Sequence, residues 1–416
     1  MRKVRCRYTV LLLVAAMLLI TTDSLFSADT PVTSAHINEI MGMFTKSQIA
    51  KGYVELDQYG RIELKGEYAD DRQVDTAFSL AQTVVGVKWV SPVTPENVKV
   101  KEWEKKLGGL FSRAAVLKPQ VKGDAPIGPV KNRYALVVGV GKFKNGINAL
   151  QYSVRDASSF YSFLVERAAF PKNNVYFLGD QNATKENIVR YLTGIRSSAG
   201  EDDLVVVYMS SHGTPPDKFG GVYIVTYDTE VKPRERVWQT ALSESVLKDF
   251  VENLRARRLV MVLDTCYSNG AYRAIPGFLP PGGKSLGVGD EDEGYGVSRE
   301  TGKRLLGAKD IVLEDTPKPK ATAAKSLDSE EAYGRVLISA SSAGEKSWES
   351  DQLRNSVFTY YFVDGLNRYQ GSVKDAFQYS KPLVEQRVKQ EKDAEQTPQA
   401  MATNQDWNMR VVPQKR

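Results

Sequence analysis

The 416-residue sequence has few of the side chains that most often form disulfides or bind metal ions. It contains two cysteines, Cys6 and Cys266, and two histidines, His36 and His212. No cluster with metal-ligand spacing is visible, so no metal site is predicted. Because Cys6 lies in an N-terminal segment that we expect to be removed, one free thiol would remain, which excludes an intrachain disulfide.

Strong charge of one sign is also absent. The formal net charge is +6, and four of the basic residues lie in the first seven positions. A balance this mild, with no basic stripe between aromatic residues, gives no support for a nucleic-acid partner. Low-complexity tracts are absent as well, and the length allows two domains or one large one.

Residues 1–28 are typical of a secretory signal peptide. Basic residues precede an apolar core, from Tyr8 to Ile20, that is short for a membrane span. Small and polar residues then lead to Ala28, and no cysteine follows the core, which argues against a lipoprotein. The pattern predicts an exported protein, periplasmic or secreted. An uncleaved N-terminal membrane anchor is the alternative.

Residues 33–100 have the pattern of a small α+β domain. Amphipathic and alternating segments predict the order αββαβ, with helices at 34–48 and 71–84 and strands at 53–57, 61–65 and 86–90. The run from Gly52 to Val90 resembles a BON domain, a fold common in bacterial envelope proteins. This resemblance implies binding to envelope lipid or to another protein. The alternative is a covering segment that packs on the rest of the chain.

Residues 101–131 are predicted to be a linker region. A charged helix is expected to begin near Val98, and residues 118–131 are rich in proline and glycine.

Two later segments deliver the scarce thiol and imidazole to comparable positions. Residues 203–213 and 258–266 are apolar, β-branched runs that end in His212-Gly213 and in Cys266. Because the runs do not alternate, we expect both faces to be buried, as in a parallel sheet covered by helices. Ligands bind beyond the carboxyl ends of such strands, so the two side chains are candidates for a Cys–His catalytic pair. A buried structural cysteine is the alternative.

Polar residues two positions earlier share a face with each member of this pair. Ser210 projects on the side of His212, and Asp264 on the side of Cys266. A carboxylate beside a nucleophile would bind a cationic group of a substrate. Capping of a local turn is the alternative for Asp264.

These motifs resemble the caspase and metacaspase superfamily of cysteine peptidases. The matching stretches are Ser-Ser-His-Gly at 210–213, Asp-Thr-Cys-Tyr-Ser-Asn-Gly at 264–270, and the segments 133–140, 150–157, 336–341 and 356–362. Ser211 stands where glycine is usual, and Thr265 and Tyr267 stand where metacaspases have Cys and His. The resemblance implies a caspase-like, mostly parallel α/β sheet sandwiched by helices over residues 132–412.

The resemblance also implies an activity and a site. Cys266 would be the nucleophile and His212 the general base, while the N–H groups of Gly213 and Cys266 would form the oxyanion hole. Asp156, which otherwise complements the start of its own helix, would line the S1 pocket with Ser210 and Asp264. We therefore expect cleavage of proteins or peptides after Arg or Lys. No cofactor is predicted; metacaspases often need calcium, but calcium ligands cannot be assigned in this sequence.

Residues 275–332 are rich in Gly, Pro and acidic residues and predict a disordered or cleavable insert. In caspases the two subunits are separated here. Arg299, Lys303 and Arg304 are the first candidates for self-cleavage, and a solvated loop is the alternative.

Two other functions remain open from sequence. One is a non-catalytic envelope scaffold that uses both domains for binding. The other is an acyl transferase or ligase that uses the same Cys–His pair.

Overall fold

The computed structural model describes residues 32–86, 89–94, 97–100, 128–214, 217–218, 223–232, 235–266, 294–295, 312–313, 333–402 and 408–413. The predicted signal peptide and most of the linker region lie outside these residues. No helix among the described residues is long and apolar enough to cross a membrane.

The N-terminal unit is a three-stranded sheet with two helices. Its elements are α2 Ser34–Lys46, β1 Gly52–Leu56, β2 Ile62–Tyr68, α3 Asp71–Val85 and β3 Val98–Val100. Strands β1 and β2 form an antiparallel hairpin, and β3 lies parallel to β2. The helices bury Ile40, Phe44 and Phe78 against the sheet residues Ile62 and Leu64. The order αββαβ is the predicted one.

The position of the last strand was predicted wrongly. Val90 makes only an isolated bridge to Ile62, and the strand lies at Val98–Val100, where a charged helix was expected to begin. Gly86 ends α3 with a φ of 83°, and Pro92 and Pro95 follow. Because proline cannot donate a ladder hydrogen bond, regular pairing resumes only after the second proline.

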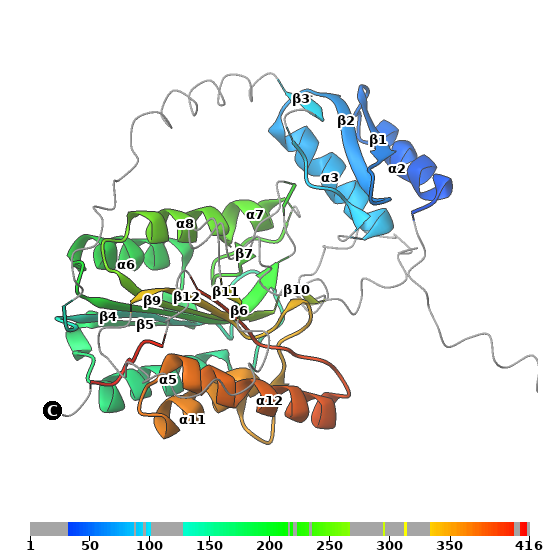
Figure 1. Cartoon of the computed structure of the whole chain (residues 1–416). Helices are drawn as coiled ribbons and strands as arrows, with labels where there is room; N and C mark the ends of the chain where they lie inside the picture. The colour runs from blue at the N-terminus through cyan, green and yellow to red at the C-terminus, as the bar shows by residue number, and fades with distance from the viewer. Residues whose placement is uncertain are drawn as a thin grey trace, which may run out of the picture.

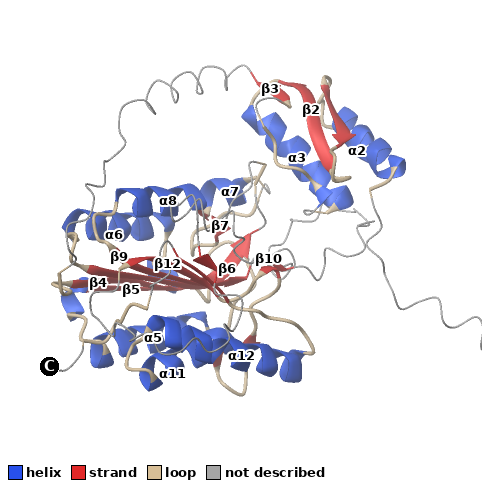
Figure 2. Cartoon of the chain, in the orientation of Figure 1, coloured by secondary structure: helices blue, strands red, loops and turns tan. Residues whose placement is uncertain are grey.

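A mixed sheet forms the centre of the second unit (Figures 1 and 2). Five strands run parallel in the order β12-β9-β6-β4-β5. They are β4 Arg133–Gly139, β5 Val175–Gly179, β6 Leu204–Thr214, β9 Arg258–Cys266 and β12 Gly334–Ser339. Strand β16 Gln399–Ala402 pairs antiparallel with β12, and β11 Val312–Leu313 pairs with β16 at the edge. The predicted caspase-like α/β fold is confirmed.

Helices cover both faces of this sheet, as Figure 2 shows. One layer contains α5 Ser153–Ser162, α11 Val357–Arg368 and α12 Val373–Lys392, and the other contains α6 Lys185–Ser198 and α8 Glu244–Asn253. All the residues of β6 are buried. Its alternate side chains enter two separate cores: Val206 and Tyr208 pack with the first layer, and Val207 and Met209 with the second. Burial on both faces explains why the strand is apolar without alternation.

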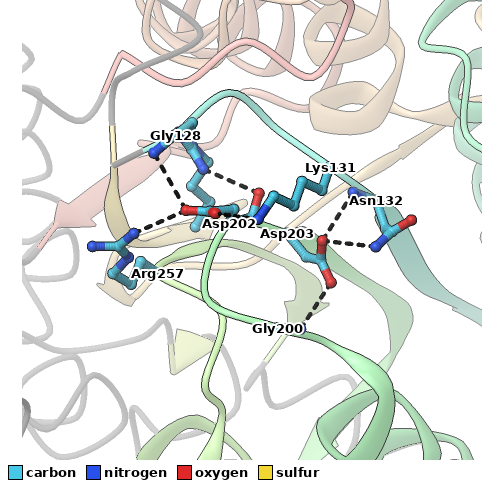
Figure 3. A network of polar contacts seen from close by, with 8 residues as sticks. Gly128, Lys131, Asn132, Gly200, Asp202, Asp203 and Arg257 are labelled. Atoms are coloured by element: carbon cyan, nitrogen blue, oxygen red, sulfur yellow. Dashed lines mark hydrogen bonds and ion pairs between the residues drawn. The ribbon is translucent and has the colours of Figure 1, made fainter. Parts of the chain in front are cut away.

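A polar network fixes the amino ends of the central strands (Figure 3). Asp202, just before β6, forms ion pairs with Lys131 and Arg257, each at 2.9 Å. Asp203 accepts hydrogen bonds from the backbone and side chain of Asn132, just before β4. The two cations hold the pKa of Asp202 low, at about 2. The register of β4, β6 and β9 is therefore set at the end opposite to the predicted site.

Two segments beside the sheet differ from expectation. The strand expected at 222–228 is only β7 Tyr223–Ile224, which pairs antiparallel with the end of β6 and with β8 Leu242–Ser243. The helix expected at 240–257 with Ser243 as its cap is the shorter α8, of which Ser243 is the N-cap, and α7 Arg236–Thr240 and β8 precede it. Local helical periodicity could not reveal that Leu242 would instead complete a β-hairpin with Ile224.

The predicted disordered insert contains two short paired segments. Strand β10 Gly294–Tyr295 pairs with β13 Ala343–Gly344, and β11 extends the main sheet. The expectation of a structureless insert is therefore wrong at these two places. Arg299, Lys303 and Arg304 lie outside the described residues, so self-cleavage there stays a prediction.

Candidate active site

The two predicted catalytic residues occupy neighbouring positions at the carboxyl end of the sheet. In the parallel ladder between β6 and β9, His212 is the register partner of Cys266, and Ser210 is the partner of Asp264. Adjacent strands lie about 4.8 Å apart. The backbone thus places His212 and Cys266 side by side, and the side chain of Cys266 lies outside the described part of the chain.

The imidazole of His212 is held in one orientation. Its Nε2 lies 3.0 Å from the carbonyl oxygen of Asn148, and since a carbonyl only accepts, Nε2 carries the proton in the neutral ring. The other nitrogen, Nδ1, is then the free base. Phe143 stacks on the ring with centroids 5.3 Å apart. Burial lowers the pKa of His212 to about 4, although the bond to Asn148 opposes this shift.

Asp264 is a buried carboxylate surrounded by hydroxyl groups. Ser347 donates to Oδ1 at 2.8 Å, and Ser356 and Thr359 both donate to Oδ2. Ser356 is the N-cap of α11, so the carboxylate also lies at a helix amino terminus, which favours negative charge. Burial raises the pKa of Asp264, and the three hydroxyl donors oppose that rise. The carboxylate therefore binds partners far from its own strand and does not cap a local turn.

Asp156, on α5, is fully buried beside Asp264 and lacks a complete set of partners. Its Oδ1 accepts from Asn355 Nδ2 at 2.7 Å and from the Ser356 N–H at 2.9 Å. Its Oδ2 is buried and has no hydrogen-bond partner among the described residues. Burial, and then the charge of Asp264, raise the pKa of Asp156 well above its usual range. Asp156 lies in the first turn of α5, as predicted, and its hydrogen bonds go to the start of α11.

A third carboxylate joins this cluster. Glu349 accepts hydrogen bonds from the backbone N–H groups of Gln151 and Tyr152, at the start of α5, at 3.0 and 2.8 Å. Burial raises its pKa, and the charge of Asp264 contributes in the same direction. This contact ties the segment after β12 to the helix that carries Asp156.

Sequence analysis assigned roles in the site to His212, Cys266, Asp156, Ser210, Asp264 and Gly213. The structure brings the backbones of the first two together and places the two aspartates side by side, with Ser210 buried as the register partner of Asp264. Gly213 is the register partner of Ile224 in β7. Its role in an oxyanion hole stays a prediction.

Several residues of the site were missed. Asn148, Asn355, Thr359 and Ser347 are polar residues in segments far from both catalytic strands in the sequence. Among the partners of the two aspartates, Ser356 has a recognisable sequence pattern, because a serine before an apolar helical run is typical of an N-cap. Their contacts with His212 and the aspartates depend on how α5 and α11 pack.

The N-terminal unit contacts the segment that follows His212. Lys218, whose side chain is 3% exposed, forms ion pairs with Asp75 at 2.6 Å and with Asp71 at 2.8 Å, both on α3. Trp238 of α7 is buried in the N-terminal core, edge-on to Phe78. These contacts agree with the alternative in which the N-terminal unit packs on the rest of the chain. Its resemblance to a BON domain stays a prediction.

Metal binding has no support from the described residues. No group of three or more His, Cys, Asp or Glu side chains among them is arranged to hold an ion. Calcium, which the resemblance raised, has no fitting ligand set there.

A helix-covered parallel sheet with His212 and Cys266 in register at its carboxyl end defines the class as an α/β domain with a Cys–His pair. The profile of the caspase domain family matches residues 132–407, and the chain belongs to this family of cysteine peptidases.

Individual relatives match over shorter stretches. Metacaspase-1A of Neurospora crassa is 25% identical over 187 residues, which are 42% of this chain and 38% of the relative. Metacaspase-4 of Arabidopsis thaliana is 29% identical over 128 residues, which are 29% of this chain and 30% of the relative. The chain thus spans under two fifths of the curated relatives it matches.

Two solved structures are similar over more of the chain. A protein of Geobacter sulfurreducens aligns with a TM-score of 0.43 and 16% identity, covering 68% of this chain and 100% of that protein. Caspase-1 of Spodoptera frugiperda aligns with a TM-score of 0.39 and 14% identity, covering 68% and 93%.

Proposed function

We propose that this protein is an endopeptidase that hydrolyses peptide bonds after Arg or Lys with Cys266 and His212. The register pairing of these two residues at the carboxyl end of neighbouring parallel strands is the observation that supports it. His212 and Cys266 lie side by side without any rearrangement of the sheet, because they end a run of nine consecutive register pairs between β6 and β9.

The chemistry follows from the orientation of the imidazole. Nδ1 of His212 takes the proton of the Cys266 thiol, and the thiolate attacks the scissile carbonyl carbon. The N–H groups of Gly213 and Cys266 stabilise the oxyanion. The imidazolium then gives its proton to the leaving amine as the C–N bond breaks. A water molecule, deprotonated by the same nitrogen, hydrolyses the thioester and restores the thiol.

The specificity follows from the two aspartates. Asp156 Oδ2 is buried without a hydrogen-bond partner among the described residues, next to a second carboxylate that is already saturated by hydroxyls. A buried acceptor of this kind is costly unless a donor reaches it. A guanidinium or ammonium group of the substrate supplies both the donor and the compensating charge. We assign Asp156 to direct contact with the substrate cation and Asp264 to fixed charge behind it.

Self-processing would follow from the same specificity. Arg299, Lys303 and Arg304 in the insert are the proposed sites, and mass spectrometry of the purified protein would show cuts after them. A Cys266→Ala protein should stay intact under the same conditions. We also propose export through residues 1–28, which the same spectra test by the mass of the mature N-terminus.

The decisive experiment is a panel of fluorogenic peptides that differ only in the P1 residue. We expect hydrolysis of Arg and Lys peptides, none of Asp peptides, and no turnover by Cys266→Ala or His212→Ala. Cleavage after Asp with none after Arg or Lys would overturn the specificity. No turnover, and no labelling of Cys266 by an electrophilic Arg peptide, would instead support a scaffold. Transfer of the acyl group to an added amine in preference to water would support a ligase.

A further inference from the structure

A ring of hydrogen bonds beside Asp264 passes through Gln396. This side chain is 1% exposed and lies between α12 and β16. Its Nε2 donates to the carbonyl oxygen of Ala340 at 2.9 Å and to Ser347 Oγ at 3.3 Å. Its Oε1 accepts a hydrogen bond from the backbone N–H of Trp348 at 2.9 Å. These partners fix the orientation of the amide, because Trp348 N–H only donates and the Ala340 carbonyl only accepts.

The ring returns to the proposed specificity residue. Ser347 Oγ, which receives the amide hydrogen of Gln396, donates its own hydrogen to Asp264 Oδ1 at 2.8 Å. At the other end, the Ala340 N–H donates to the Leu263 carbonyl at 3.0 Å, one residue before Asp264. The hydrogen bonds thus connect Gln396 to β9 by two routes, through Ala340 to Leu263 and through Ser347 to Asp264.

We infer that Gln396 is a positioning residue for P1 recognition, which it controls by fixing Ser347 against the Asp264 carboxylate. This inference rests on the proposed specificity for Arg or Lys. Without Gln396, Ser347 loses the donor that orients its hydroxyl, and the buried Ala340 carbonyl loses its side-chain partner. Asp264 then keeps two of its three hydroxyl donors, Ser356 and Thr359, and its carboxylate is held less firmly beside the substrate cation.

A Gln396→Met variant tests this inference, since Met has a similar length and no amide. We expect the KM for Arg and Lys peptides to rise about tenfold while kcat changes much less, because a lost bond to a charged group weakens binding of the cation. Gln399→Met is the matched control: Gln399 lies three residues later, and among the described residues its side chain makes one long bond, to the Thr397 carbonyl at 3.4 Å. Its KM should equal that of the wild type.

A double-mutant cycle with Ser347→Ala separates positioning from general damage to the fold. If Gln396 acts through Ser347, the double variant should be little worse than either single one. Titration of each protein with a saturating electrophilic Arg peptide, which must bind the site before it labels Cys266, counts the correctly folded sites. A purely structural role would lower that count and leave KM unchanged, and this result, or additive effects in the cycle, would overturn the inference. Ser347→Ala alone must also raise KM, which keeps the inference testable if Gln396→Met does not fold.

The wild-type protein distinguishes the two proposals. Wild-type cleavage of Arg peptides with an unchanged KM in Gln396→Met would remove only the role of Gln396. Absence of wild-type activity on both Arg and Lys peptides would remove the proposed function and this inference together.

Discussion

The carbonyl oxygen of Asn148 accepts a hydrogen bond from Nε2 of His212 at 3.0 Å. This contact joins the loop after β4 to the end of β6, and it leaves Nδ1 as the basic nitrogen of the ring. A backbone carbonyl thereby orients the imidazole, and no side chain at position 148 is needed for it.

We expect His212 to make the protein less stable in acid. Burial lowers its pKa to about 4 from 6.5, so the folded state binds fewer protons than the unfolded state between these values. The stabilisation is present above pH 6.5 and is lost as the pH falls toward 4. Because the two states bind different numbers of protons, the free energy of unfolding should fall by up to about 3 kcal/mol. Chemical unfolding at pH 7 and pH 4.5 should show a smaller difference in the free energy of unfolding for His212→Gln than for the wild type.

Phe143 is predicted to keep the imidazole dry. Its ring stacks on His212 at 5.3 Å, and Phe143→Ala would admit water to that face. The pKa of His212 should then rise toward its ordinary value, since desolvation is its main cause of depression. NMR titration of the His212 ring in a Cys266→Ala background measures this shift directly. An unchanged titration midpoint would show that other groups exclude the solvent.

Asp156→Asn should separate stability from activity. The raised pKa of Asp156 means that its ionised form disfavours the folded state, and this penalty is absent at low pH and appears as the pH rises. An amide removes the penalty and places a donor near Asp264. We expect the free energy of unfolding at pH 7 to increase by about 1 kcal/mol, a gain typical when a functional site is relieved. The kcat/KM for Arg peptides should fall by about a hundredfold or more, the cost of removing one partner of a buried charge pair.

Binding of a basic P1 side chain should release a proton. The pKa values of Asp156 and Asp264 are both raised by burial, so the free pair retains a proton that a substrate cation displaces. Affinity for an uncleavable Arg peptide should therefore increase with pH above the ordinary carboxyl range. Calorimetry in two buffers of different ionisation enthalpy measures the released proton. A peptide with a P1 norleucine should release none, and equal release from both peptides would contradict this explanation.

Lys218 should anchor the N-terminal unit. Its side chain is 3% exposed and is paired with Asp75, which is 12% exposed. Lys218→Met leaves a buried carboxylate without its cation, a change that costs about 3–5 kcal/mol. We expect limited proteolysis to separate the two units faster in this variant. Lys51→Met is the control, because Lys51 pairs with Glu67 on the surface, at 74% and 53% exposure, where solvent screens the ion pair.

The sequence by itself determined the fold class and the strand ends at which His212 and Cys266 lie. Runs of buried strand residues that end in His212 and Cys266 leave few alternatives, because helix-covered parallel strands carry their ligands at their carboxyl ends. The period-two rule also placed Ser210 beside His212 and Asp264 beside Cys266, and the ladder pairs Ser210 with Asp264. These inferences depend only on local geometry, which sequence spacing fixes.

Tertiary packing decided everything that links distant segments. The partners of Asp264 come from Ser347, Ser356 and Thr359, more than eighty residues later in the chain. The contacts of Asp156, the contact of Asn148 with His212 and the hydrogen bonds of Gln396 follow no sequence periodicity, since each depends on how one loop or helix end meets another. Hydrophobic patterning specifies which faces are buried, but hydrogen-bond partners within the buried space are selected only when the layers come together.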